Sequence, residues 1–279
     1  MKEQIISNSK SSSSSTTIQN FISRKKIAHS QKLNNHFELI LFEEWTTCKS
    51  ASILLGFADI GITPIITTSS LVEQLNLPQI GFLKSKTQPP SAIIRSGQPS
   101  HSIRIFGNSE LVIINSDHKF KKQKIVHSLI DSVIKVAHLF ESKMIYSTEG
   151  VPVETVERIE RKEMQFLTTN AEMGNKIASL GHKVLDNAVV AGISGGLLAE
   201  CSLLPSLDGC SPDFCLILAP TCSLYPDVWS SVMIIQLLNS LLNTTSDTSN
   251  LEVSARKLEA KANELINIHK KPVHNNLYL

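Results

Sequence analysis

The stretch ILLGFADIG, residues 53–61, decides how the fold is interpreted. Its first six residues, Ile53 to Ala58, form an apolar run that is typical of a strand buried on both faces. Asp59 to Gly61 make a turn, and a helix pattern then runs from Thr63 to Leu75. Gln79 to Leu83 is the next strand candidate. This order of strand, turn, helix and strand predicts a βαβ unit with parallel pairing.

Strand and helix patterns alternate along the rest of the chain. Further strand candidates are residues 37–42, 92–95, 102–106, 111–114, 144–146, 165–167, 188–191 and 214–219, with 92–95 and 102–106 resembling a hairpin arm. Helix patterns cover residues 122–142, 170–180 with Asn170 as the cap, 226–241 and 251–265. The alternation predicts a single α/β domain over residues 35–269, with three layers and a mostly parallel sheet, and a flexible tail at residues 270–279.

The composition is that of an ordinary globular protein. Of the 279 residues, 42% are hydrophobic and 19% charged, and the formal net charge is +2. This small charge does not indicate nucleic acid or an anionic membrane as a binding partner. The aromatic content of 5% argues against a surface on which bases stack. No window approaches the ~18 apolar residues of a membrane span. We therefore expect a cytoplasmic protein with neither of these partners.

Residues 1–34 are predicted to be disordered. They contain the serine run Ser11 to Ser15 and the basic cluster Arg24 to Lys26, with too few apolar residues to offset the entropy of ordering. The segment lacks the apolar core of a secretory signal. An organelle presequence is the alternative, because the composition is rich in serine and basic residues and poor in acids.

The cysteines do not form a metal-binding pattern. Four of the five fall between Cys201 and Cys222, but their spacing is irregular and no pair forms CxxC. We expect incidental, buried thiols in a reducing compartment. The histidines show no metal-ligand spacing either, so neither a metal nor a cofactor is expected.

Two glycine-containing loops are candidates for chemistry. The loop Gly56 to Gly61 follows a strand and opens a helix, as phosphate-binding loops do, but it matches neither dinucleotide nor P-loop motifs, and Asp59 would repel a phosphate. The segment Gly192 to Gly196 has the pattern G-x-S-x-G, which places Ser194 as the nucleophile of an α/β hydrolase. The alternative is a tight turn with close packing, which glycines permit.

A hydrolase triad would need an acid and a histidine after Ser194. Asp208, Asp213 and Asp227 are available as acids. The only later histidines are His269 and His274, which lie beyond the last core helix. The triad therefore lacks a suitably placed histidine, and Ser194→Ala is expected to leave the activity of the protein unchanged.

The last helix and the tail suggest assembly and docking. Leu251, Ala255, Leu258, Ala262 and Leu265 form a heptad seam, which packs either on the domain or on a second subunit. The helix pattern ends before Pro272.

Residues 277–279, Leu-Tyr-Leu, end the given sequence with an aromatic residue between two leucines. Such an end suits a pocket for a ring, an aliphatic side chain and a carboxylate, or it folds back on its own domain.

Three motifs in order resemble the proteasome assembly chaperone family, over about Leu39 to Ile268. They are residues 56–61 (GFADIG), followed by a helix ending LVEQL and the strand start QIG, residues 192–198 (GISGGLL) and residues 225–227 (YPD), which precede a leucine-rich helix. Asp59 stands where the family usually has Asn, and the segment 192–198 is shorter than in the family.

The resemblance implies a fold like that of nucleoside phosphorylases and related hydrolases, without their catalytic residues. It implies a non-enzymatic chaperone of the proteasome core particle that forms homo-oligomers. Several members end in a hydrophobic residue, Tyr and any residue, which docks between α-subunits of the proteasome. Leu277, Tyr278 and Leu279 match that rule and are the expected partner-binding residues. The alternatives are a hydrolase or phosphorylase-like enzyme, and a family member without proteasome binding.

Overall fold

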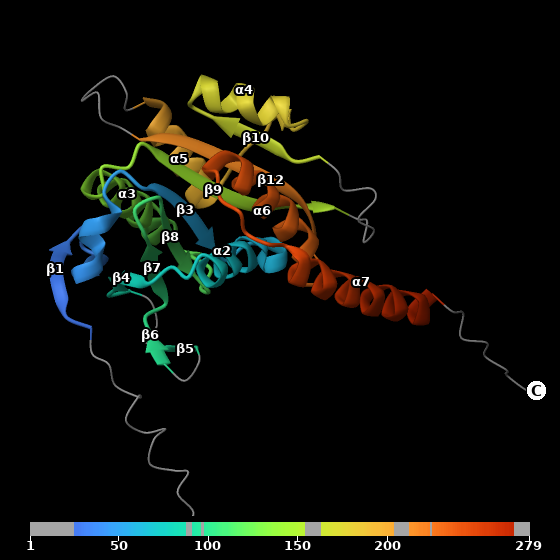
Figure 1. The fold of residues 1–279 in the computed structure, drawn as a ribbon, viewed down its shortest axis with the longest axis horizontal. Coiled ribbons are helices and arrows are strands. Elements are labelled where there is room, and N and C mark those ends of the chain that lie inside the picture. The colour runs from blue at the N-terminus through green and yellow to red at the C-terminus, as the bar shows by residue number, and fades with distance from the viewer. Residues whose placement is uncertain are drawn as a thin grey trace, which may run out of the picture.

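The protein has a large central sheet, which the computed structural model describes over residues 25–87, 91–95, 98–153, 163–203, 212–223 and 225–270. Ten strands follow the order β1-β2-β4-β7-β8-β3-β9-β12-β10-β11 (Figure 1). They are β1 (Ile27–Lys32), β2 (Phe37–Phe42), β3 (Ser52–Phe57), β4 (Gln79–Ser85), β7 (Ile103–Gly107), β8 (Leu111–Ser116), β9 (Met144–Val153), β10 (Gln165–Thr168), β11 (Lys183–Val184) and β12 (Asp213–Cys222).

The middle of the sheet is parallel and its flanks are largely antiparallel. Strands β8, β3, β9 and β12 form one parallel block, whereas β1, β2, β4 and β7 pair antiparallel with their neighbours. The predicted single α/β domain is confirmed, but the expectation of a mostly parallel sheet is wrong outside this block. The predicted pairing of β3 with β4 is also wrong, because the antiparallel run β4-β7-β8 places two strands between them.

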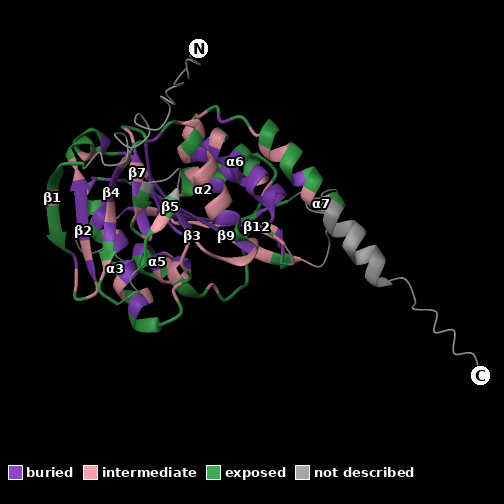
Figure 2. Cartoon of the chain, turned by 90° about the horizontal axis from the view of Figure 1, so that it is seen from below, coloured by how far each residue is buried: buried purple, intermediate pink, exposed green. Residues whose placement is uncertain are grey.

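Helices cover both faces of the sheet. Alternate residues of a strand point to opposite faces, so Ile53 and Leu55 join one core cluster with α3 and α5, and Leu54 joins a second cluster with α2, α4 and α6. Figure 2 shows α2 and α6 on one side and α3 and α5 on the other. The helices are α2 (Thr63–Gln74), α3 (Gln123–Leu139), α4 (Ala171–Ser179), α5 (Gly192–Leu203), α6 (Val228–Leu242) and α7 (Ser249–Lys270), with short 3₁₀ turns η1 (Glu43–Cys48) and η2 (Ile60–Ile62).

Local sequence signals place several helix ends correctly. Asn170 caps α4, and its side-chain oxygen accepts a hydrogen bond from the Met173 backbone N–H at 2.9 Å. The apolar spacing predicted for residues 122–142 is realised in α3, which buries Leu129, Val133 and Val136. These elements are confirmed because capping and periodicity are local properties of the chain.

One strand prediction and one pairing prediction are wrong. Residues 188–191 are not a strand: Ala188, Val189 and Ala191 are exposed, Val189 to 96%, so this apolar run has no buried face and forms a connection before α5. Strand β5 (Ile93–Arg95) pairs with β6 (Gln98–Ser100) in a separate two-stranded sheet. Residues 103–107 therefore join the main sheet as β7 and do not form the far side of a hairpin arm.

The fold begins earlier than predicted. Strand β1 pairs with β2 and lies inside the segment 1–34 that was expected to be disordered, so that boundary is wrong for residues 25–34. Leu33 is 4% exposed, and the Asn34 side chain donates to the Ser128 carbonyl at 2.7 Å. A polar edge strand needs little apolar content of its own, because the paired strand behind it supplies the buried face. Residues 1–24 lie outside the described residues.

Helix α7 packs against α6 and α2 through its first turns. Ala255 is buried among Val228, Trp229 and Val232 of α6, and Leu251 and Leu258 lie at the margin of this cluster. The predicted seam is thus intramolecular over Leu251, Ala255 and Leu258. The side chains of Ala262 and Leu265 lie outside the described residues. Beyond this contact α7 extends away from the body of the molecule (Figure 1).

Asp227 fastens the start of α6 to the end of β12. The carboxylate is fully buried and accepts hydrogen bonds from the Ser230 N–H at 3.1 Å and the Cys222 N–H at 2.6 Å. The first of these bonds is a helix N-cap. The second turns the chain sharply out of the sheet, so that α6 returns over the same face.

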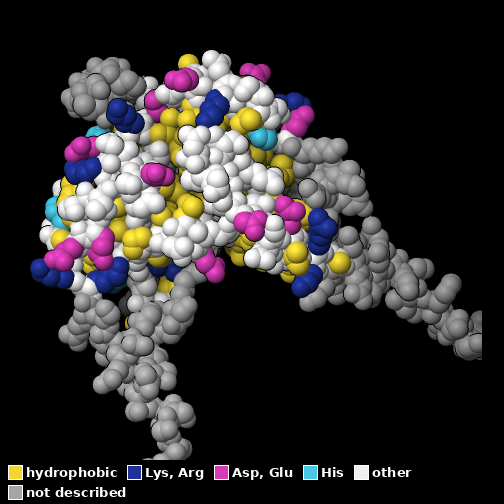
Figure 3. All heavy atoms as spheres, viewed as in Figure 1, with side chains coloured by type: hydrophobic (Ala, Val, Ile, Leu, Met, Phe, Trp, Pro, Cys, Tyr) yellow, Lys and Arg dark blue, Asp and Glu magenta, His cyan; other side chains and the backbone are white. Residues whose placement is uncertain are grey.

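None of the described helices combines the length and hydropathy that crossing a bilayer requires. On the face in Figure 3, basic and acidic side chains are interspersed and form no extended area of one sign.

The four described cysteines are free and buried, as expected: Cys48, Cys201, Cys215 and Cys222. Cys210 lies outside the described residues.

The fold generates a first prediction about the amino-terminal boundary. A chain that starts at residue 35 should be less stable than one that starts at residue 25, by at least about 2 kcal/mol in free energy of unfolding, because burial of Leu33 alone contributes ~1.5–3 kcal/mol. Urea unfolding of the two chains measures the difference. Equal midpoints and slopes would show that β1 contributes nothing to the domain.

A second prediction concerns Asp227. Asp227→Ala should lower the free energy of unfolding by about 2–4 kcal/mol, because it removes a helix cap and leaves a buried backbone N–H without its acceptor. The matched control is Asp131→Ala, since Asp131 is exposed on α3. Chemical denaturation should place the control within ~0.5 kcal/mol of the unmodified protein. An Asp227 variant as stable as the control would refute the role given to this carboxylate.

Candidate functional site

The two glycine-containing loops singled out in the sequence meet at one pocket. Ala58 and Asp59 follow β3, and Gly192 to Ser194 open α5 on the other side of a cavity of about 140 Å³. Strands β3 and β9 are parallel neighbours, so the polar residues at their carboxyl ends reach the same edge of the sheet. Crevices at the carboxyl ends of parallel strands are the usual ligand sites of open α/β sheets.

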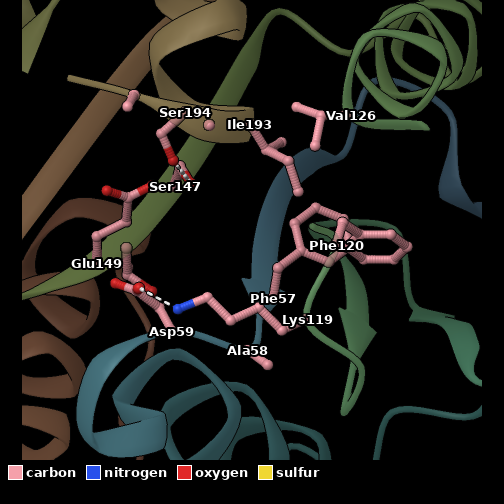
Figure 4. A pocket seen from close by; sticks show the side chains of 13 residues that line it. Phe57, Ala58, Asp59, Lys119, Phe120, Val126, Ser147, Glu149, Ile193 and Ser194 are labelled. Atoms are coloured by element: carbon pink, nitrogen blue, oxygen red, sulfur yellow. Dashed lines mark hydrogen bonds and ion pairs between the residues drawn. The ribbon is translucent and has the colours of Figure 1, made fainter. Parts of the chain in front are cut away.

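One side of the pocket is polar. Ser147 and Glu149 lie two residues apart on β9 and therefore point to the same face of the sheet, where α5 packs. The hydroxyls of Ser147 and Ser194 are 2.8 Å apart, and both residues are almost completely buried. Figure 4 shows these side chains grouped together, with the Glu149 carboxyl beside them.

Glu149 is the most perturbed acid of the described chain. Burial is the main cause that raises the pKa of its carboxyl, and the nearby charge of Asp59 also raises it. A hydrogen bond from Ser194 and the charge of Lys119 lower the pKa, and the resulting value is about 7. Glu149 is therefore close to half-protonated near neutral pH, which is unusual for a carboxylic acid and typical of functional sites.

Asp59 links the pocket to the backbone of β9. Its carboxylate accepts a hydrogen bond from the Gly150 N–H at 3.2 Å and lies 4.0 Å from the Lys119 ammonium. The side chain of Asp59 is 26% exposed and that of Lys119 is 59% exposed, so solvent weakens the ion pair. The carboxylate is held in place mainly by the backbone, and Lys119 is a loosely held partner.

The opposite side of the pocket is apolar. Phe57 and Phe120 meet edge to face, with ring centroids 5.7 Å apart and planes at 88°. Val126 and Ile193 continue this wall (Figure 4). The pocket thus joins carboxyl and hydroxyl groups on one side to a hydrocarbon surface on the other, which is the usual composition of a small-molecule site.

The residues of a serine hydrolase are not brought together. Ser194 is 2% exposed, and none of the described residues that line the pocket is a histidine. Asp213 binds Thr169 and Asn170, and Asp227 caps α6, so neither faces Ser194. Asp208 and His274 lie outside the described residues, as does the side chain of His269. Glu149 accepts a hydrogen bond from Ser194, but no described histidine completes a triad with these two residues.

The glycines of both loops serve close packing. A side chain at Gly56 would collide with Thr68 of α2, and one at Gly196 would collide with Ile130 of α3. Gly56 is therefore covered by a helix and is not open to a phosphate. In the described part of the chain, no group of three or more His, Cys, Asp or Glu residues is arranged to hold a metal ion.

The predicted partner-binding residues are not placed by the structure. Leu277, Tyr278 and Leu279 lie outside the described residues, which end at Lys270. Neither docking of these residues nor their packing against the domain is tested by the geometry.

Glu149, Ser147 and the role of Lys119 in this pocket were not predicted from the sequence. The sequence does contain a signal: Ser147 and Glu149 occupy alternate positions directly after the apolar run 144–146, as polar residues do where the carboxyl end of a strand reaches a polar site. The predicted strand ends at Tyr146, whereas β9 continues to Val153.

Solved structures share this architecture. PbaA of Pyrococcus furiosus, described as an archaeal homolog of proteasome-assembly chaperone, is similar with a TM-score of 0.72 and 20% identity, over 85% of this chain and 94% of that chain. PbaB of the same organism, described as an archaeal proteasome activator, has a TM-score of 0.69 and 13% identity, over 83% and 99%. At these identities the likeness shows the fold.

Sequence comparison gives a relationship over most of the chain. An uncharacterized protein of Methanocaldococcus jannaschii is 25% identical over 219 residues, which are 78% of this chain and 87% of that protein. The model of the PAC2 family matches residues 53–266, from β3 into α7. This match includes all three motifs that carry the predicted family resemblance, and it confirms that resemblance. The chain belongs to the PAC2 family.

Proposed function

We propose that this protein is a non-enzymatic chaperone or activator of the proteasome core particle, and that it docks through Leu277, Tyr278 and Leu279. The observation that carries the proposal is the family match over residues 53–266. The descriptions of PbaA as a homolog of proteasome-assembly chaperone and of PbaB as a proteasome activator support it. Acting on the proteasome in this way would place the protein in the cytoplasm.

The course of α7 supports a tethering role. Among its described side chains, those of the first turns, around Ala255, anchor the helix to α6, and the helix then extends away from the domain (Figure 1). From Leu258 to Lys270 it advances about 18 Å. Residues 271–279 can add at most about 30 Å when extended. A tail that starts at the far end of such a helix can reach a partner without the domain having to touch it closely.

The chemistry of the last three residues suits a pocket between two subunits. The α-carboxylate of Leu279 would pair with a lysine, the Tyr278 ring would supply buried area and a hydroxyl, and Leu277 would fill an apolar entrance. A single such contact is weak. In the homo-oligomer that we also propose, several tails would bind together through their high effective concentration.

The proposal generates a prediction about the tail. Removing Leu277 to Leu279 should abolish binding to proteasome α-rings while the fold and the oligomeric mass stay unchanged. Tyr278→Ala should act almost as strongly, since a buried aromatic anchor contributes ~2 kcal/mol or more per site. Tyr278→Phe should be milder, because it removes only a hydrogen bond of roughly 0.5–1.5 kcal/mol. Surface plasmon resonance on immobilised α-rings measures each variant.

The control for carboxylate capture is one residue added after Leu279. The extension should weaken binding as strongly as Tyr278→Ala, because it moves the carboxylate past its partner. A tail that binds only by hydrophobic contact would tolerate the extra residue. Unchanged affinity of the extended protein would therefore rule out carboxylate capture, and unchanged affinity of the truncated protein would rule out tail docking altogether.

A separate prediction concerns catalysis. Ser194 should not be labelled by a fluorophosphonate probe, because the residue is 2% exposed and no described histidine lines the pocket beside it. Ser194→Ala should bind α-rings with the affinity of the unmodified protein. Stoichiometric labelling that disappears in Ser194→Ala would show instead that the protein is a serine hydrolase.

A further inference from the structure

We propose that the pocket between β3, β9 and α5 binds a small organic cation, with a primary ammonium group held by Asp59 and Glu149. This site is separate from the tail, and its existence does not depend on the proposed proteasome partner. The ligand would have a short apolar body that lies against Phe57 and Phe120.

The charges of the pocket favour a cation. Two carboxyl groups, Asp59 and Glu149, and one ammonium group, Lys119, are the ionisable groups that line it. They face one another from the turn after β3, from β9 and from the loop before α3, and the charges of Asp59 and Lys119 both act on Glu149. With both acids ionised the pocket carries one net negative charge. α5 contributes the uncharged Ser194, whose hydroxyl is already engaged.

The ammonium group of Lys119, the cation already present in the pocket, is easily displaced. Lys119 approaches Asp59 only to 4.0 Å, and 59% of its side chain is exposed. An exposed pair at this distance is weakly held. A ligand ammonium in the cavity could sit closer to Asp59 and also reach Glu149, while Lys119 returned to water at little cost.

The apolar wall and the size of the pocket limit the rest of the ligand. A volume of about 140 Å³ leaves room for a short hydrocarbon chain. The rings of Phe57 and Phe120, with Ile193 and Val126, bury such a chain and favour a nearby cation. A metal ion would gain nothing from this hydrocarbon surface, because metal ions bind to oxygen, nitrogen or sulfur ligands.

Binding should be coupled to a proton. Because the pKa of Glu149 is about 7, the acid is largely neutral at pH 6 and largely ionised at pH 8. The raised pKa marks a carboxylate that lacks solvation and gains from a positive partner. An ammonium ligand supplies this partner, so its binding should release the proton of Glu149.

The test is isothermal titration calorimetry with n-butylammonium as the probe. The full chain should bind it about tenfold more tightly at pH 8 than at pH 6, which follows from a required group with a pKa of about 7. Near pH 7 about half a proton should be released per ligand bound, measured as the dependence of the heat on the ionisation enthalpy of the buffer. n-Butanol and butyrate are the neutral and anionic controls, and neither should bind.

Substitutions separate this site from nonspecific attraction. Glu149→Gln should weaken binding about tenfold at pH 8 and abolish the pH dependence, and Asp59→Asn should weaken binding at both pH values. Lys119→Met should strengthen binding, because it removes the competing ammonium, whereas an anion site would lose affinity. Glu172→Gln on α4 and Lys121→Met are exposed matched controls and should change nothing.

Several results would overturn the proposal. They are an affinity equal for butylammonium and butanol, binding of butyrate in place of butylammonium, a weaker site in Lys119→Met, or no detectable heat at millimolar probe at pH 8. Lys119→Met alters an exposed side chain and keeps the fold, so the outcome remains decisive even where an acid variant proves unstable.

Discussion

The turn that joins β3 to α2 is the constraint on which the rest of the structure depends. Gly61 and Ile62 adopt left-handed backbone conformations, with φ of 62° and 49°. For a β-branched residue such as Ile62 this costs roughly 1–2 kcal/mol. Two hydrogen bonds tie the turn to distant segments: the Gly61 carbonyl accepts from the Asp227 N–H at 2.9 Å, and the Asp59 carboxylate accepts from the Gly150 N–H. Three segments far apart in the sequence are thereby fixed at one point.

The pocket and the cluster that anchors α7 both involve residues of this turn or of the helix that follows it. On one side, Asp59 leaves the turn as a wall of the pocket beside Glu149. On the other side, the helix that follows packs against α6, where the Ser231 hydroxyl donates to the Thr63 carbonyl at 3.2 Å, and Ile66 borders the cluster that anchors α7. The pocket and the base of the tail are therefore held by one short segment, although they lie on different sides of it.

Elements with a local sequence signal could be predicted. The cap at Asn170, the amphipathic α3 and the apolar core strands were predictable, because capping and periodicity depend only on neighbouring residues. Prediction failed where the surroundings of a segment decide: β1 is polar but pairs with β2, whereas residues 188–191 are apolar but lie mostly exposed before α5 and pair with no described strand. The polar positions of Ser147 and Glu149 on a strand were visible in the sequence, but the raised pKa of Glu149 was not, since burial and the nearby Asp59, Lys119 and Ser194 arise only in the folded chain.

The shared turn raises the question of whether the pocket and the tail influence each other. A ligand couples two sites only if it binds two conformations with different affinity. An ammonium that replaces Lys119 would exchange one cation beside Asp59 for another and would leave the bond from Asp59 to the Gly150 backbone in place. The contacts of Gly61 with Asp227, and of α2 with α6, do not involve the exchanged group. The geometry thus separates the proposed cation pocket from the helix that precedes the proposed docking residues, and the turn contacts the elements that build both.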